Sequence, residues 1–191
     1  MAVRMFHTPL GWMAAAVRDG ELAAVILPAG DPDSVRAALA AQGLAETTNG
    51  GSALLDRLEA DLARYFAGRA VDFADYPVDL TRLSPFQRAA LGAVRRLPAG
   101  EVRSYAWVAA QAGNVRACRA AGQAMHANPA PLVIPCHRVV ASDGALTGFG
   151  GGVALKRALL AHEGVRLDGE RVVLAWGNRP ERPSERPSCD C

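Results

Sequence analysis

A cysteine followed directly by a histidine is the feature of this sequence best suited to chemistry. Cys136 lies between Pro135 and His137. A thiol acts as a nucleophile in its thiolate form, so it needs a base or a positive neighbour, and His137 is the nearest base. Adjacent side chains of an extended segment point to opposite faces, so we expect a water molecule to carry the proton between them. For a Cys-His pair taken alone, a buried cysteine beside a structural histidine is the commoner situation.

Glu163 is the acid best placed to act on such a histidine. Leu155, Leu159 and Glu163 recur every four residues, which places the glutamate on the apolar face of a predicted helix. Its carboxylate would lie at the helix C-terminus, where the helix dipole disfavours negative charge. A histidine N–H would compensate for this and would fix the tautomer of the imidazole. The alternative is that Glu163 extends into solvent.

A helix predicted over residues 115–126 combines small residues with one polar stripe. The small residues are Ala117, Ala120, Ala121, Gly122 and Ala124. Arg116, Arg119 and Gln123 share one face because they are spaced at i, i+3 and i+7. Such a helix could approach a nucleic-acid groove closely. Tight packing against its own domain is the simpler interpretation when the helix is taken alone.

Charge is unevenly distributed along the 191 residues. The formal net charge is +2, yet Glu101 is the only acid between Thr81 and Arg138. The bases of this stretch are Arg82, Arg88, Arg95, Arg96, Arg103, Arg116, Arg119 and Arg138. A one-sided stretch of this kind attracts a polyanion, and a solvated arginine surface is an equally good explanation.

Composition excludes several classes of protein. Half of the residues are apolar and 21% are charged, which is typical of a globular domain. No apolar run is long enough to span a membrane, and Met1–Leu10 has no signal-peptide pattern, so we expect a cytoplasmic protein. The cysteines are Cys118, Cys136, Cys189 and Cys191. They form neither a disulfide framework nor a CxxC-type zinc site, so we expect no metal and no cofactor.

Periodicity and turn residues predict strands first and helices afterwards. Apolar runs over residues 13–17 and 22–27 flank Arg18-Asp19-Gly20, a hairpin turn signal. Helices are predicted over residues 34–41 with Asp33 or Ser34 as the cap, from Ser52 to Gly68, and over residues 84–97, 105–112, 115–126 and 153–163. Residues 71–80, 132–134 and 138–140 should be extended. The pair of helices over residues 105–126 matches a helix-turn-helix.

We therefore expect an α/β protein in two parts. Residues 1–80 would form an N-terminal domain with a small sheet and helices. Residues 81–175 would form a mostly helical C-terminal domain that holds the site. Residues 176–191 are rich in Pro, Arg, Glu and Ser and should be disordered.

The segment Pro135-Cys136-His137-Arg138-Val139-Val140 resembles the signature of the O6-alkylguanine-DNA alkyltransferases, also called methylated-DNA–protein-cysteine methyltransferases. Matching residues lie on both sides of it. Upstream are Gly100-Glu101-Val102, Ser104-Tyr105, Gly113-Asn114, Ala117-Cys118-Arg119-Ala120 and Asn128-Pro129. Downstream are Leu146-Thr147-Gly148-Phe149, Gly151-Gly152, Lys156 and Leu159-Leu160-Ala161-His162-Glu163-Gly164. The resemblance covers residues 84–167 and, through Thr8–Gly11 and Val17–Gly20, part of the N-terminal region.

The resemblance implies a DNA repair reaction by direct reversal. Cys136 would take a methyl or other alkyl group from guanine O6 irreversibly, once per molecule, with O4-alkylthymine as a second substrate to be tested. His137 would accept the thiol proton through water, and Glu163 would orient His137. Tyr105 would donate a hydrogen bond or proton to the leaving guanine, and Asn128 would brace the turn. A ribonuclease-H-like N-terminal domain is also implied.

The implied partner is double-stranded DNA that contains O6-alkylguanine, bound by a monomer. The damaged base would flip out of the duplex, and Arg119 would fill the gap. The minor groove would receive the helix that carries Arg119, and the surrounding arginines would contact phosphates. The other residues of this DNA-binding helix are Arg116, Ala117, Ala120, Gly122 and Gln123. The base pocket would consist of Met125, Pro131, Val139, Phe149 and Gly150.

Phe149 and Gly150 depart from the family, in which tyrosine and serine are common at these positions. They bear on the rate and the preferred alkyl size. Cys118, beside Arg119, is expected to be a buried filler. Other classes of protein fit the sequence less well: a lesion-binding relative would lack the reactive cysteine, a cysteine hydrolase would not explain Arg119 or Tyr105, and a helix-turn-helix regulator would not explain the Cys136 segment.

Overall fold

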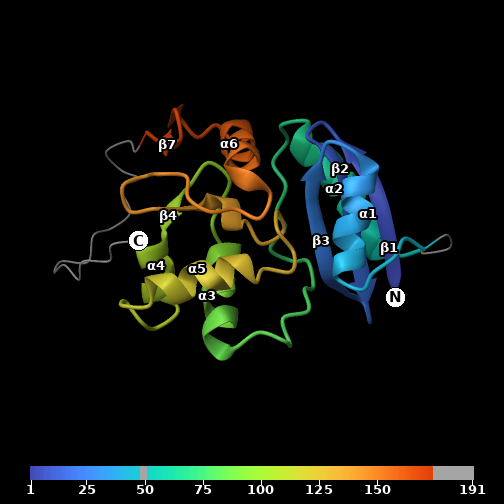
Figure 1. The fold of residues 1–191 in the computed structure, drawn as a ribbon, viewed down its shortest axis with the longest axis horizontal. Coiled ribbons are helices and arrows are strands. Elements are labelled where there is room, and N and C mark those ends of the chain that lie inside the picture. The colour runs from blue at the N-terminus through green and yellow to red at the C-terminus, as the bar shows by residue number, and fades with distance from the viewer. Residues whose placement is uncertain (48–50, 174–191) are drawn as a thin grey trace. The chain divides into compact units, whose positions relative to one another are not determined.

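The computed structural model describes residues 1–47 and 51–173, and they form two compact units with helices and strands (Figure 1). The first unit consists of Met1–Thr81 together with Pro129–Val133. The second consists of Arg82–Asn128 and the described residues from Ile134 onward. The tail predicted to be disordered, with Cys189 and Cys191, lies outside the described residues. None of the described helices has both the length and the apolar character that a membrane crossing requires.

The first unit is built on an antiparallel sheet in the order β1-β2-β3. Its strands are β1 (Ala2–Thr8), β2 (Gly11–Arg18) and β3 (Glu21–Ala29). The two strands predicted from the apolar runs over residues 13–17 and 22–27 are confirmed as β2 and β3. Asp19 and Gly20 have φ angles of 51° and 82°, the left-handed conformations that a tight hairpin turn needs. Residues 13–17 are all buried, which shows that β2 is covered on both of its faces.

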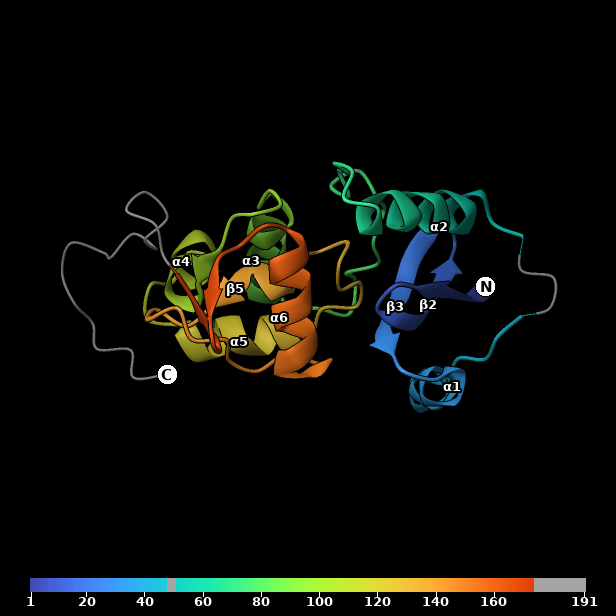
Figure 2. The same cartoon turned by 90° about the horizontal axis from the view of Figure 1, so that it is seen from above.

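Two helices cover the opposite faces of this sheet, α1 (Pro32–Ala41) and α2 (Ala53–Phe66) (Figure 2). Helix α2 follows the prediction: Ser52 caps it, and its apolar stripe is buried. Helix α1 begins earlier than predicted, and the expected cap was wrong. Asp31 caps it by accepting a 2.8 Å hydrogen bond from the backbone N–H of Ser34, and Pro32 occupies the first turn.

The outer edge of β3 is covered by segments that arrive from elsewhere in the chain. Leu22 donates its N–H to the carbonyl oxygen of Pro77 at 2.8 Å, and Val25 donates to that of Pro129 at the same distance. The segment at residues 71–80 was predicted to be extended. Residues 74–76 form a turn instead, and pairing with β3 is confined to residues 77–79.

The second unit is mostly helical. Its helices are α3 (Pro85–Arg95), α4 (Tyr105–Gln111), α5 (Cys118–His126) and α6 (Gly152–His162), with one short 3-10 turn, η1 (Cys136–Arg138). Its strands are β4 (Arg103–Ser104), β5 (Val139–Val140), β6 (Leu167–Asp168) and β7 (Arg171–Val172). Strands β4 and β5 pair in parallel, and β6 and β7 form an antiparallel hairpin.

Several predicted helix ends in the second unit were wrong. Helix α5 begins at Cys118 and not at Val115, because the Asn114 side chain accepts the N–H of Arg116 at 3.1 Å and holds a turn there. Helix α3 ends at Arg95, short of residue 97, and α6 ends before Glu163, which is its C-cap. Residues 132–134 are not a strand, because Leu132 has a φ of 73° and begins a turn with Val133.

Candidate active site

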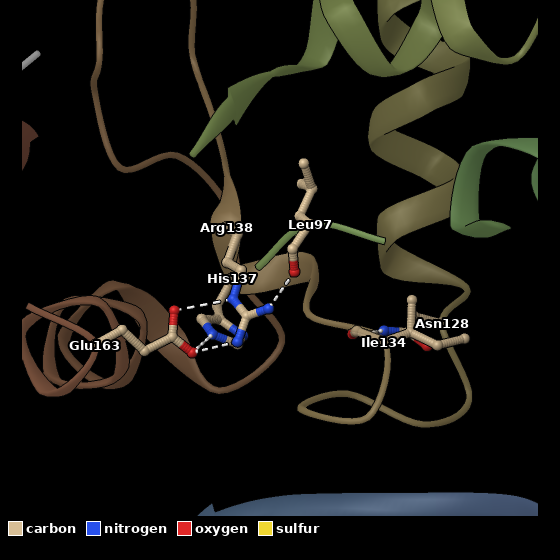
Figure 3. A network of polar contacts seen from close by, with 6 residues as sticks. All are labelled: Leu97, Asn128, Ile134, His137, Arg138 and Glu163. Atoms are coloured by element: carbon tan, nitrogen blue, oxygen red, sulfur yellow. Dashed lines mark hydrogen bonds and ion pairs between the residues drawn. The ribbon is translucent and has the colours of Figure 1, made fainter. Parts of the chain in front are cut away.

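Cys136 begins the 3-10 turn η1, where we had expected an extended segment. The turn is closed by backbone bonds from Cys136 to Ile134 at 2.8 Å and from Arg138 to Pro135 at 2.9 Å. The expectation that neighbouring side chains alternate between two faces therefore does not apply here. Instead, His137 and Arg138 both extend toward Glu163 (Figure 3).

The Cys136 thiol is buried and is not part of a disulfide. Asn128 lies against it, with its side-chain nitrogen 3.2 Å from Sγ and 2.8 Å from the carbonyl oxygen of Ile134. One amide group therefore contacts both the thiol and the backbone at the start of the turn. Burial raises the pKa of Cys136, although the Asn128 hydrogen bond and the charge of Lys156 oppose this rise. A base is needed to produce the thiolate at neutral pH.

His137 is joined to Glu163 as expected, through a contact of 2.9 Å between Nε2 and Oε1. Both side chains are 1% exposed, so the alternative of a solvated Glu163 was wrong. Burial lowers the pKa of His137, despite the carboxylate beside it. A neutral imidazole that donates from Nε2 has its lone pair on Nδ1. Within the described chain Nδ1 is buried and has no hydrogen-bond partner, so it is free to accept a proton.

Arg138 belongs to this site. From the sequence we had grouped it with the arginines that attract a polyanion. Its side chain is buried, donates to the two Glu163 oxygens at 2.9 and 2.7 Å, and also donates to the carbonyl oxygen of Leu97. Contact with DNA phosphates is therefore excluded for Arg138. Burial by itself raises the pKa of Glu163, but hydrogen bonds from His137 and Arg138 outweigh burial and lower it. The carboxylate is thus ionised when it orients the imidazole.

Lys156 is a second charged residue of this site. In the sequence it was noted only as one of the residues that match the family. Its amine is fully buried and donates to the carbonyl oxygens of Val139 at 2.5 Å and Thr147 at 3.0 Å. Burial lowers the pKa of Lys156 to about 8. A signal for it was present, because Lys156 precedes Leu159, Leu160 and Glu163 by three, four and seven positions and so shares the inward face of α6.

Tyr105 is the first residue of α4, directly after β4. Because β4 pairs with β5, the start of α4 is held beside the segment that follows Cys136. The Lys156 nitrogen lies 5.9 Å from the centre of the Tyr105 ring. Burial raises the pKa of Tyr105, and a hydrogen bond with the Thr147 side chain opposes the rise. The phenol therefore stays protonated at neutral pH and is a hydrogen-bond donor.

Comparison with known proteins identifies the relatives of this site. A family model for the DNA-binding domain of 6-O-methylguanine DNA methyltransferase matches residues 85–165. The methylated-DNA–protein-cysteine methyltransferase of Methanothermobacter thermautotrophicus is 39% identical over 140 residues, which are 72% of this chain and 78% of that protein. The chain belongs to the family of methylated-DNA–protein-cysteine methyltransferases.

Two further members of the methyltransferase family show how far the likeness extends. The Salmonella typhimurium protein is 47% identical over 106 residues, which are 56% of this chain and 61% of the length of that relative. The crystal structure of Mycobacterium tuberculosis OGT in complex with DNA superposes with a TM-score of 0.68 at 34% identity and covers 85% of this chain and 92% of that one. The fold is therefore shared across both units of this methyltransferase-family chain.

The residues expected to face DNA in this methyltransferase-family member lie on an exposed part of the second unit. Arg116, Arg119, Ala120 and Gln123 are exposed, whereas Ala117 and Gly122 are half-buried. The opposite face of α5 is buried, so the simpler interpretation of tight packing holds for that face alone. The residues on it are Cys118, Ala121, Ala124 and Met125. The expectation that Cys118 is a buried filler is confirmed by its 4% exposure.

The residues expected to form the base pocket differ in their surroundings. Met125 and Val139 are buried in the second unit, Phe149 is half-buried, and Gly150 is exposed. Pro131 is buried and belongs to the first unit. Across residues 1–47 and 51–173 no group of three His, Cys, Asp or Glu side chains could hold a metal ion.

Proposed function

We propose that this protein transfers an alkyl group from O6-alkylguanine in double-stranded DNA to Sγ of Cys136, irreversibly and once per molecule. The observation that carries the proposal is the chain of contacts around Cys136. A buried thiol lies beside Asn128, and the next residue, His137, has its Nε2 held by an ionised Glu163 and its Nδ1 unpaired. These contacts support Cys136 as the nucleophile, His137 as its base and Glu163 as the acid that orients the base.

The proposed reaction is one in-line displacement. The Sγ proton passes through a water molecule to Nδ1 of His137, and Glu163 stabilises the imidazolium that forms. The thiolate attacks the alkyl carbon, a C–S bond forms, and the C–O6 bond breaks with its electron pair leaving on guanine. Tyr105 donates a hydrogen bond or proton to the leaving base, while Asn128 braces the turn. The product is a thioether on Cys136, and nothing in the mechanism regenerates the thiol.

The target carbon is hidden inside a duplex, so we propose that the base is flipped out at a cost of a few kcal/mol. Arg119 would fill the gap, and the exposed face of α5 would lie in the minor groove as part of a helix-turn-helix formed with α4. The exposure of Arg119 and Gln123 on α5, and of Arg116 just before the helix begins, supports this role. The DNA complex of the Mycobacterium tuberculosis relative supports binding to DNA. The base pocket would use Met125, Pro131, Val139, Phe149 and Gly150.

We further propose the finer features that the resemblance implies. They are a ribonuclease-H-like N-terminal domain at residues 1–80, a C-terminal domain at residues 81–175, action as a monomer, and a cytoplasmic location. The three-stranded antiparallel sheet with helices on both faces supports the first of these. Gel filtration at several concentrations tests the monomer, because a dimer would elute earlier as concentration rises.

Intact mass spectrometry tests the function directly. The wild type and Cys136→Ala would each be incubated with duplex DNA that contains one O6-methylguanine. We expect the wild type alone to gain one methylene, and never more than one per molecule. A wild type that binds the lesion without any gain in mass would overturn alkyl transfer in favour of lesion binding. A methyl group released into solution with turnover would instead indicate a hydrolase.

A further inference from the structure

The hairpin β6–β7 lies against residues 144–146, a segment next to the site that has no role in the proposed mechanism. Backbone bonds join the hairpin to residues 144–146: Leu146 donates to Glu170 at 2.8 Å, and Val172 donates to Gly144 at 2.9 Å. A β-bridge between Ala145 and Arg171 lies between these two bonds. Residues 144–146 therefore pair with β7 and lie as a third strand beside the β6–β7 hairpin.

Side chains strengthen this attachment. Val172 is 7% exposed and belongs to an apolar cluster with Val140, Leu146 and Leu160. On the surface, Arg171 forms a 2.6 Å ion pair with Asp143 and also donates to its carbonyl oxygen at 3.2 Å. The buried valine should contribute more than the ion pair, because exposed ion pairs are screened by solvent.

The attached segment leads directly into Thr147. The carbonyl oxygen of Thr147 accepts the Lys156 ammonium at 3.0 Å, and the same ammonium lies 5.9 Å from the centre of the Tyr105 ring. On its other side Thr147 is followed by Gly148-Phe149-Gly150-Gly151-Gly152. A segment so rich in glycine has high conformational freedom and holds a neighbour in place poorly. The position of Thr147 is thus restrained by residues 144–146, which the hairpin anchors, and not by the glycines that follow it.

The same hairpin is tied to the other end of the site. Helix α6 ends at Glu163, and the chain passes through Gly164 and Val165 into β6 within a few residues. Val165 belongs to the same apolar environment as Val172 and donates its N–H to Leu160 at 3.0 Å. The hairpin is therefore anchored on α6, the helix that also carries Lys156.

We propose that hairpin β6–β7 is a positioning element, which holds Thr147 against the Lys156 ammonium and so keeps that ammonium in place beside the Tyr105 ring. Through it Val172 and Arg171 govern the rate of alkyl transfer, although neither contacts the thiol or the base. The inference about rate rests on the proposed function, because Tyr105 acts there on the leaving guanine. Small displacements of a positioned group reduce rates strongly, by as much as about 100-fold per ångström.

The test compares Val172→Ser with Val173→Ser. Val173 is the next residue and is 44% exposed, which makes it the matched control. Single-turnover transfer from duplex DNA with O6-methylguanine should be about tenfold slower in Val172→Ser and unchanged in Val173→Ser. Val172→Ile, which keeps an apolar side chain in the cluster, should retain the wild-type rate.

A spectroscopic signal separates positioning from mere stabilisation. Tyrosines labelled with 13C at the ring carbon that bears the oxygen report on their hydrogen bonds, and Tyr105→Phe identifies the Tyr105 resonance. We expect this resonance to shift in Val172→Ser, well below the melting temperature, because the Lys156 ammonium beside the ring would be displaced. Arg171→Ala, whose side chain is exposed and cannot unfold the core, should shift it in the same direction by less.

The outcomes are distinct. A Val172→Ser protein that melts earlier, but keeps the wild-type rate and Tyr105 resonance, would overturn the proposal. A slower rate with an unmoved resonance would also overturn it. If Val172→Ser does not fold, Arg171→Ala decides, and an unmoved resonance there counts against the hairpin. If the wild type transfers no methyl group, the proposed function fails, while the resonance still tests the hairpin because it needs no substrate.

Discussion

The two units of this protein bury different kinds of side chain. Among the described residues of the first unit, the buried ones are apolar except for Thr8, and they form the ordinary core of a sheet covered by helices. The second unit buries His137, Arg138 and Lys156 together with the Glu163 carboxylate. Burying charge costs free energy unless the charges are paired. The difference fits the proposal that the second unit carries the chemistry, whereas the first unit has an ordinary apolar core.

The largest effect should come from breaking the buried network at its centre. Glu163→Ala leaves Arg138 without its carboxylate, which should lower the free energy of unfolding by about 3–5 kcal/mol, and His137 loses its orienting group, so alkyl transfer should stop. Urea unfolding and single-turnover transfer measure the two effects. Glu163→Gln is the matched control, because it keeps a hydrogen-bond acceptor without the charge and should retain part of the stability.

A comparable loss of stability in the first unit should leave the chemistry intact. Leu58 is fully buried in α2, and Leu58→Ala should lower the free energy of unfolding by about 2–5 kcal/mol through the cavity it creates. The folded fraction should still transfer methyl groups at the wild-type rate. A reduced rate in fully folded Leu58→Ala would show that the contrast between the units is wrong.

Acid should lower the stability of the protein through buried groups of the second unit. Since burial lowers the native pKa of His137, the unfolded chain takes up more protons once the pH falls below about 6.5, and stability decreases. Glu163 acts in the same direction below about 4.5, because its native pKa is also lowered. The slope contributed by His137 approaches about 1.4 kcal/mol per pH unit.

Urea unfolding between pH 7 and pH 5 measures this slope. His137→Gln removes the titrating group, so its stability should change less over this range than that of the wild type. The rate of alkyl transfer should persist below pH 6.5 and fall only when the native His137 takes up a proton. A wild type whose stability rises on acidification would contradict the burial of a neutral His137.

The smallest effect on stability should come from the exposed face of the second unit. Arg119→Ala should change the free energy of unfolding by no more than about 0.5 kcal/mol, because its side chain lies in solvent. Binding to lesion-containing duplex should nevertheless weaken, and fluorescence anisotropy measures it. Arg36→Ala on helix α1, also exposed and charged, is the control and should leave DNA binding unchanged.

Much of the molecule could be predicted from the sequence, because the relevant forces act over a few residues. The turn at Asp19 and Gly20, the apolar stripe of α2 and its cap at Ser52 are local effects of backbone conformation and side-chain spacing. The pairing of His137 with Glu163 was also accessible, since an acid on the apolar face of a helix end needs a partner. Where prediction failed locally, as at Asp31 and Asn114, the side chain of that residue accepted a backbone N–H two or three positions further along the chain.

Other features were decided by tertiary structure alone. The sequence analysis grouped Arg138 with the arginines that attract a polyanion. In the structure it is buried instead, because it pairs with a carboxylate 25 residues away and with the carbonyl oxygen of Leu97. Lys156 is buried because the carbonyl oxygens of Val139 and Thr147 converge on it, and hairpin β6–β7 closes on residues 144–146. Whether a charge lies in solvent or in a core depends on residues distant in sequence, and no local pattern carries that information.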